Sequence, residues 1–219
     1  MNETTNETNT TMDREQSWPV IIERRLAVAE LLDSLTDREW ETPSLCAGWR
    51  VRDVAAHLAM IPDPPSPGSM VADTVRARGS FHRMNHDIAI RAAQRPPADI
   101  AADMRRHASS RRLPVVTNYR NVMFDVLVHS LDIAIPLGRD LPMPVEAAAA
   151  GATRVWQMGW PFWSRRRLRG LRLDATDTRW SVGSGDLVAG PIEALLMLVT
   201  GRTEAALPRL TGPGVPRLK

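Results

Sequence analysis

Cysteine and lysine are almost absent from this 219-residue chain. Cys46 is the single cysteine, which excludes an intramolecular disulfide, a CxxC redox pair and a cysteine-rich structural zinc site. Lys219, at the last position, is the single lysine, which excludes a P-loop and Schiff-base chemistry. Any metal ion must therefore be bound by histidine and carboxylate side chains.

Long apolar runs are lacking as well. No run approaches the ~18 residues of a membrane-spanning helix, and the first residues have no basic-then-apolar signal pattern. The net charge of +3 is small for this length, and the arginines are mixed with acidic residues, so charge does not indicate nucleic-acid binding. We expect a cytoplasmic protein that acts on small molecules, with no nucleic-acid or membrane partner, as a monomer or a homodimer.

Composition and periodicity divide the chain into three parts. Residues 1–16 are polar and low in complexity, which predicts a disordered tail. Residues 17–163 predict a helical bundle, and residues 164–219 predict a small α+β C-terminal domain with two strands and an apolar helix.

The helices of the bundle follow from apolar residues at three- and four-residue steps. The pattern predicts four main helices and a fifth, at 18–37, 51–61, 69–94, from 114–118 to 136, and 145–160. Proline-rich segments separate several of them. The predicted fold class is therefore mainly α, an antiparallel four-helix bundle followed by the α+β domain.

The stretch FDVLVHSLDI carries ionisable groups where a core helix is expected. Asp125, His129 and Asp132 follow the spacing i, i+4, i+7, which places all three on the helix face that carries Val122 and Val126. A buried carboxylate is unfavourable unless it is paired or bound to a metal. Another helix must therefore supply a partner.

His57 on the 51–61 helix is such a partner, because it lies on the apolar stripe beside Leu58. Two histidines and a carboxylate from facing helices would form a three-ligand site with an open fourth position, as in catalytic zinc sites. Asp132 would accept the spare ring N–H of His129. The spacing alone leaves a second interpretation open, a hydrogen-bonded core pair or an aspartate bridged to Arg52 or Arg120.

Other ring-bearing residues have weaker patterns. His82 and His86 project away from the apolar side of their predicted helix and are expected in solvent, whereas Asn85 lies closer to that side. The tryptophans of RVWQMGWPFW recur at helical spacing. We expect these residues, Trp156, Trp160 and Trp163, to pack the small domain onto the bundle.

Four segments together resemble the mycothiol-dependent maleylpyruvate isomerase family, a group of DinB-like helical bundles. They are PSLCAGWRVRDVAAHL at 43–58, SFHRMNHDIAIRAAQRPPADI at 80–100, DVLVHSLDIAIPLGRDLPMP at 125–144, and LRLDATDTRWSVGSG with GPIEALLMLVTGR at 171–202. The resemblance implies a divalent metal, usually zinc, bound by a histidine of the second helix and a carboxylate-x-x-x-His pair of the fourth. His57, Asp125 and His129 match those positions. It also implies mycothiol as co-substrate.

The resemblance implies a zinc-dependent enzyme that isomerises a maleylpyruvate-like compound or transfers the thiol to an electrophile. The isomerase itself resembles this chain with a glutamate where Asp125 stands, one methylene longer. Arg52, Asn85 and Arg120 are candidates for binding the thiol or a substrate carboxylate.

Two alternatives remain at this point. In one, Cys46 is the nucleophile with His57 as its base, although a buried structural cysteine is favoured. In the other, the bundle is a non-catalytic metal- or ligand-binding protein that acts as a sensor or partner.

Overall fold

The computed structural model describes residues 10–62, 67–114 and 117–218. Most of the expected tail, residues 1–9, lies outside the described residues. The described chain is mainly helical with one small sheet, which confirms the predicted fold class. Its α-helices are α1 (Arg14–Asp33), α2 (Asp37–Trp40), α3 (Val51–Met60), α4 (Pro67–Arg76), α5 (Phe81–Ala92), α6 (Pro97–Arg106), α7 (Tyr119–Ala134), α8 (Val145–Gln157), α9 (Ser164–Arg167), α10 (Ile192–Val199) and α11 (Thr203–Ala206).

The first helix starts earlier than its apolar pattern indicates. α1 begins at Arg14, so the prediction of a disordered segment reaching residue 16 is wrong for its last three residues. The cause is a capping box: the Asp13 carboxylate accepts from the backbone N–H of Gln16, and the Gln16 side chain accepts from the N–H of Asp13. Two polar residues thereby start a helix whose apolar side begins only with the buried Trp18.

The third predicted helix, 69–94, is two helices in the structure, α4 and α5. The chain turns between them, where Arg78 and Gly79 have φ angles of 52° and 73°. A residue in this left-handed region cannot continue an α-helix. Ser80 then starts α5 by accepting from the backbone N–H of Arg83.

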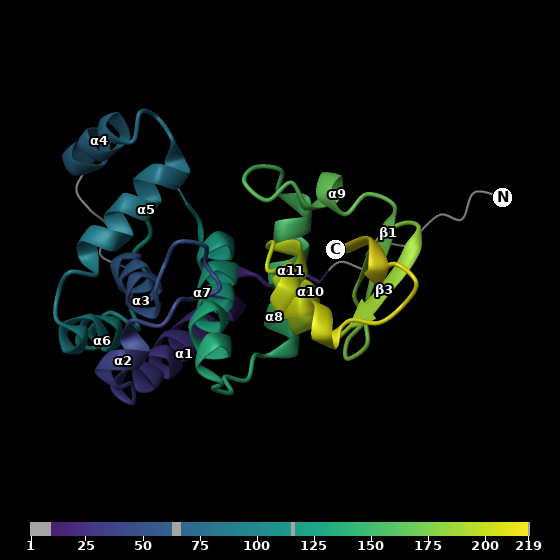
Figure 1. Ribbon diagram of the computed structural model, residues 1–219, viewed down its shortest axis with the longest axis horizontal. Helices are drawn as coiled ribbons and strands as arrows, with labels where there is room; N and C mark the ends of the chain where they lie inside the picture. Colours follow the sequence, from purple (N-terminus) through teal and green to yellow (C-terminus); the bar gives the residue numbers. More distant parts are fainter. Residues whose placement is uncertain (1–9, 63–66, 115–116, 219) are drawn as a thin grey trace.

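Five helices pack together: α1, α3, α5, α6 and α7. Of these, α7 lies next to the C-terminal elements (Figure 1). α7 packs against α1, α3 and α8, which buries most of its length. The helix starts where Asn118 accepts from the backbone N–H of Asn121. Two polar residues of α7, Ser130 and Asp132, are therefore fully buried.

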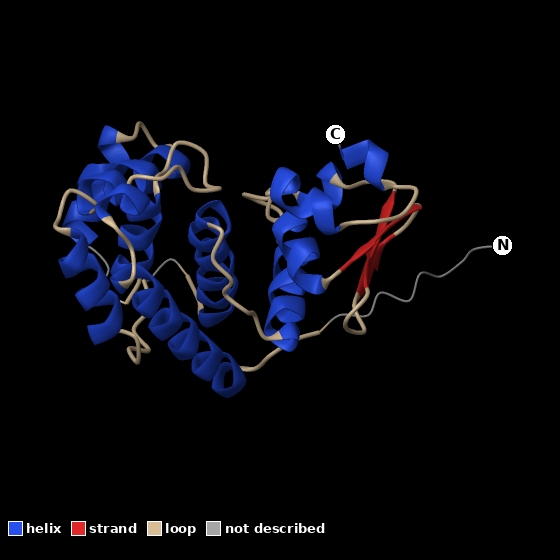
Figure 2. Cartoon of the chain, turned by 60° about the horizontal axis from the view of Figure 1, so that its bottom comes forward, coloured by secondary structure: helices blue, strands red, loops and turns tan. Residues whose placement is uncertain are grey.

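The sheet lies at one end of the molecule, on the side of α8 and α10 that faces away from α7 (Figure 1 and Figure 2). Its strands are β1 (Leu171–Ala175), β2 (Ser181–Gly183) and β3 (Asp186–Gly190), in the order β2-β1-β3, with β2 antiparallel and β3 parallel to β1. The second predicted strand is thus two strands. Gly185, with φ 118°, turns the chain past the end of β1, where a Cβ atom would overlap the carbonyl oxygen of Gly170.

α8 joins the two ends of the molecule. It packs against α7 on one side and α10 on the other, and its Thr153 hydroxyl accepts from the indole N–H of Trp180, 3.0 Å away, in the chain before β2. A domain boundary at residue 164 stays a prediction. None of the described helices combines the length and the apolar character that a membrane span requires.

Candidate metal centre

α3 and α7 bring together the three residues that the sequence singled out as ligands. His57 Nε2 lies 3.3 Å from Asp125 Oδ2, and His129 Nε2 lies 3.5 Å from Asp125 Oδ1. The two imidazole rings are 5.0 Å apart and meet edge to face. One donor atom from each of the three residues lies within 4.8 Å of the other two. One ion between them would contact all three.

The cluster is reached from solvent. The Asp125 side chain keeps 28% of its exposure, and those of His57 and His129 keep 12% each. A structural zinc site is enclosed by four protein ligands, whereas a catalytic site keeps a position for water or substrate. The exposed edge of Asp125 gives this cluster such a position.

Asp132 holds the other nitrogen of His129. Its Oδ2 lies 2.8 Å from His129 Nδ1, and its side chain has no exposed surface. A buried carboxylate at this distance keeps one ring proton on Nδ1, so Nε2, which faces Asp125, is the nitrogen that would offer its lone pair to a metal ion. This is the position that the sequence predicted for Asp132.

Arg202 neutralises Asp132, and sequence reasoning did not find it. Its Nε and Nη2 atoms donate to the two oxygens of Asp132 at 3.0 and 2.6 Å, and Nη1 donates to the carbonyl of Thr200 at 2.9 Å. The residue lies between α10 and α11, 70 positions from its partner. An arginine directly after an apolar helix was the single signal in the sequence. The C-terminal part of the chain therefore completes the centre.

Cys46 lies beside this second ion pair. Its sulfur accepts from Arg202 Nη2 at 3.5 Å and forms a close group with His129 and Asp132. The alternative that paired Cys46 with His57 is therefore not the arrangement seen. The thiol is half-buried in the loop before α3, where its carbonyl accepts from the backbone N–H of Trp49 at 2.9 Å.

Trp49 lies against the candidate ligands and was also missed by the sequence reasoning. Its ring centre is 5.4 Å from that of His57, 6.0 Å from that of His129 and 6.3 Å from that of His86. The indole is almost fully buried. It limits the movement of both ligand rings and separates them from the core.

The charges of the cluster change the protonation of its members. Burial alone would lower the pKa of His129, but the carboxylates of Asp125 and Asp132 outweigh it and hold that pKa well above its ordinary value. Burial would raise the pKa of Asp125, but the imidazoles of His129 and His57 outweigh it and hold that pKa well below its usual range. An imidazolium thus balances Asp125 when no metal is bound.

The three residues predicted to bind the cofactor, Arg52, Asn85 and Arg120, are not among the three candidate metal ligands. Arg52 is committed to the protein, since it donates to Glu41 at 2.6 Å and to the carbonyls of Ala93 and Arg95 at 3.0 and 3.1 Å. Arg120 stacks on Tyr119 at the start of α7.

Asn85 lies on α5, half-buried, next in sequence to the His86 that contacts Trp49. Asn85 thus stays a candidate for binding the thiol, whereas the structure keeps Arg52 in other contacts. His82 and His86 were both expected in solvent; His82 is exposed, but His86 is half-buried against the indole.

The expectation for the three tryptophans is correct for one of them. Trp156 is buried on α8, whereas Trp160 and Trp163 are 51% and 53% exposed. The helical spacing does not continue, because α8 ends at Gln157. The prediction that these residues pack the small domain onto the bundle is wrong for Trp163, which packs against Gly159 of its own segment, whereas the exposed Trp160 meets Phe81 of α5.

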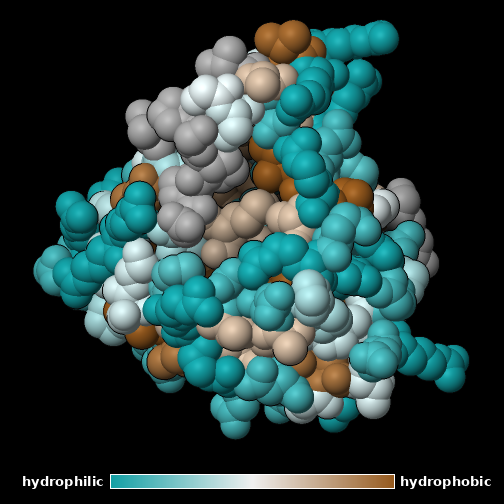
Figure 3. Space-filling model, turned by 90° about the vertical axis from the view of Figure 1, so that its left-hand side faces the viewer, coloured by the Kyte–Doolittle hydropathy of each residue, from teal (hydrophilic) through white to brown (hydrophobic). Residues whose placement is uncertain are grey.

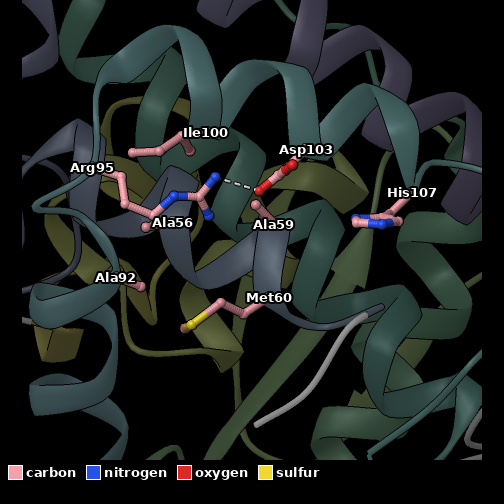
Figure 4. Close-up of a pocket in the computed structure, with 8 residues that line it drawn as sticks. All are labelled: Ala56, Ala59, Met60, Ala92, Arg95, Ile100, Asp103 and His107. Carbon is pink, nitrogen blue, oxygen red and sulfur yellow. Dashed lines mark hydrogen bonds and ion pairs between the residues drawn. The ribbon is translucent and has the colours of Figure 1, made fainter.

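A small pocket between α3, α5 and α6 is separate from the centre. Figure 3 shows a mostly hydrophilic face with apolar residues gathered near its middle, and Figure 4 shows the pocket itself. Asp103 and His107 line it from α6 and its end, and Asp103 pairs with Arg95 at 2.5 Å. None of the predicted site residues lines this pocket. The candidate function therefore rests on the centre between α3 and α7.

The donor set fits a divalent transition metal. Two imidazoles and one carboxylate, with one imidazole held by a second carboxylate, form the ligand set of several catalytic zinc sites. The shorter Asp125 side chain still reaches both rings, as the distances of 3.3 and 3.5 Å show. The Cys46, His129 and Asp132 group fits an ion less well, because the Arg202 guanidinium already occupies its carboxylate.

Comparisons with known proteins agree with this reading of the fold. Residues 23–114 match the family model described as the mycothiol maleylpyruvate isomerase N-terminal domain. The match includes His57 and ends before α7. No curated protein sequence matches the chain.

Two crystal structures are similar to the whole chain. The mycothiol-dependent maleylpyruvate isomerase aligns with a TM-score of 0.62 at 15% identity, and a histidine-to-alanine mutant of it aligns with the same TM-score at 14% identity. Each alignment covers 92% of this chain and 93% of the other. At this identity the likeness concerns the fold. The resemblance seen in the sequence is confirmed: residues 23–114 match the model of the mycothiol maleylpyruvate isomerase N-terminal domain family, and the chain has the fold of that isomerase.

Proposed function

We propose that this chain is a metal-dependent enzyme, with zinc as the favoured ion, that uses mycothiol to isomerise a maleylpyruvate-like compound or to modify an electrophilic substrate. The observation that carries the proposal is the convergence of His57, Asp125 and His129 donor atoms within 4.8 Å. The family of the N-terminal part and the fold of the whole chain support the same reaction class.

Each residue of the centre has a distinct part. His57, Asp125 and His129 would hold the ion, which lowers the pKa of a bound thiol so that sulfur is nucleophilic near neutral pH. Asp132 keeps the proton of His129 on Nδ1. Arg202 balances the charge of Asp132, so that carboxylate does not compete for the ion.

The proposed chemistry is addition and elimination at carbon. The thiol sulfur forms a bond to one carbon of an electron-poor double bond, and the other carbon takes up the electron pair. The former double bond can then rotate. Breaking of the carbon–sulfur bond restores the double bond in the trans form and releases the thiol unchanged. With a leaving group on the substrate, the same attack would give a thioether and expel that group.

An accessible centre supports an enzyme over a non-catalytic metal-binding bundle. A sensor or structural site needs an ion enclosed by protein, whereas the Asp125 carboxylate has 28% of its surface open. Water or sulfur can therefore occupy a fourth position beside this edge.

The test is the His57→Ala variant, with His86→Ala as the matched control. His57 and His86 both contact Trp49, but of these two only His57 belongs to the ligand cluster. Elemental analysis after zinc loading should show about one zinc per chain in the wild type and in His86→Ala, and none in His57→Ala. Turnover of maleylpyruvate with mycothiol should be lost together with the zinc in His57→Ala.

Two results would reject the proposal. One is stoichiometric zinc in His57→Ala, which would place the ion elsewhere. The other is a zinc-loaded wild type that neither binds mycothiol nor uses it, which would favour the non-catalytic bundle.

A further inference from the structure

A series of aromatic and imidazole rings leads from the surface to the candidate metal centre. At its outer end, Trp160 from the chain between α8 and α9 meets the start of α5. Its ring centre is 5.0 Å from that of Phe81 and 5.7 Å from that of His82. Figure 1 shows this connecting segment extending toward α5 from the other half of the molecule.

The series continues along α5 toward the centre. His82 and His86 are four residues apart, so they lie on one side of the helix about one turn apart. The His86 ring is 6.3 Å from that of Trp49, which contacts the rings of both His57 and His129. Ring contacts at both ends, with one turn of α5 between His82 and His86, thus lie between Trp160 and two candidate ligands.

The outer rings are unusually exposed for apolar side chains. Trp160 is 51% and Phe81 43% exposed, although they touch each other. The imidazole of His82 lies beside both, with its ring centre 6.2 Å from that of Phe81 and 5.7 Å from that of Trp160. Flat apolar faces with hydrogen-bonding groups at their edges are suited to a ring that is apolar on its faces and polar at its rim. A polyhydroxylated ring, such as a sugar, has this character.

We propose that Trp160, Phe81 and His82 form a subsite for the sugar-like rings of the thiol co-substrate, with its sulfur directed to the centre formed by His57, Asp125 and His129. This inference rests on the proposed function and adds to it the residues that select the thiol. His86 lies between the two ends and would hydrogen-bond to the middle of the thiol.

The subsite joins elements from both halves of the chain. Phe81 and His82 belong to α5, and Trp160 follows α8. Arg202 also comes from the C-terminal half, and it holds Asp132 on α7. The C-terminal part would therefore contribute to binding the body of the thiol as well as to the metal centre.

The test compares mycothiol with free cysteine, which carries the sulfur but no sugar-like ring. Zinc-loaded wild type, Trp160→Ala and Phe81→Ala would be titrated with each thiol by calorimetry. The matched control is Trp163→Ala, because Trp163 is equally exposed on the same segment but packs against Gly159. Zinc content and circular dichroism would be measured for every variant.

Removing one stacking ring should weaken mycothiol binding about 5- to 10-fold in Trp160→Ala and in Phe81→Ala. Cysteine affinity, zinc content and fold should not change, and Trp163→Ala should equal the wild type. Phe81→Ala tests the contact from α5 independently if the Trp160 variant is misfolded.

Unchanged mycothiol affinity in both variants, in a wild type that binds mycothiol, would overturn the subsite and leave the proposed function standing. An equal loss of mycothiol and cysteine affinity would also overturn it, because the rings would then act on the sulfur end. A wild type that binds zinc but neither thiol would overturn the proposed function and the subsite together.

Discussion

Two carboxylates on α7, seven residues apart, have opposite surroundings. Asp125 lies between two imidazoles and keeps 28% of its side-chain exposure. Asp132 is fully buried, and the Arg202 guanidinium binds both of its oxygens. Both were expected on one inward face of a single helix, and the partners that reach them differ.

The comparison separates a charge with a fixed partner, at Asp132, from the charge that we propose to bind a metal ion, at Asp125. The charge of Asp132 is balanced by a permanent cation, because arginine stays protonated under all ordinary conditions. The charge of Asp125 is balanced by the His129 imidazolium, whose second ring proton can be exchanged. A metal ion can replace that proton at Asp125, whereas nothing at Asp132 needs replacement.

The largest effect should come from breaking the Asp132 side. Asp132→Ala leaves Arg202 largely buried without its counter-ion, and the loss of one partner of such a pair is expected to lower the free energy of unfolding by about 3–5 kcal/mol. Urea denaturation measures it. The double variant Asp132→Ala, Arg202→Met should recover part of the loss. A decrease below about 1 kcal/mol in Asp132→Ala would show that the pair is not structural.

The Asp125 side should respond in metal affinity more than in stability. Asp125→Asn removes a charged ligand and is expected to weaken zinc binding by more than about 100-fold, beyond what loss of an outer partner gives. Asp125→Glu keeps the carboxylate and should stay within about 10-fold of the wild type. Competition with a chromogenic chelator measures both. Equal affinities in Asp125→Asn and the wild type would remove Asp125 from the ligand set.

A smaller effect is expected in the pH dependence of zinc affinity, because Asp125 and Asp132 both act on His129. Because Asp125 and Asp132 raise the pKa of His129, the metal-free protein carries a proton there at neutral pH. Zinc must displace it, so zinc affinity should rise about tenfold per pH unit up to that raised pKa and level off above it. In Asp132→Asn the pKa falls and the levelling should move to lower pH. Calorimetry over a pH series would detect the shift, and an unmoved curve would contradict it.

The fold was predictable where side-chain periodicity reports on structure. The apolar steps placed α3, α7 and α8 within a few residues of their observed positions. The same reasoning joined α4 and α5 into one helix, because the break depends on the φ angles of Arg78 and Gly79 rather than on an apolar pattern. It also missed the Asp13 and Gln16 capping box, which lies in a segment of polar composition.

The site was predictable where its members share a helix. The spacing of Asp125, His129 and Asp132 fixes their common face, and the apolar stripe of α3 supplied His57. Arg202 and Trp49 were not predictable in this way. Arg202 meets its partner across 70 residues, and Trp49 reaches the rings from a loop.

The sequence by itself determined the helices, the inward direction of their polar residues and the family to which they are similar, because these follow from local periodicity and short motifs. Only the tertiary structure decided which partner each polar residue receives. Helix faces are set by spacing within a segment, but the contacts of Asp132 with Arg202 and of Trp160 with Phe81 depend on how distant segments pack. That packing gives one carboxylate an arginine and leaves the other facing two imidazoles.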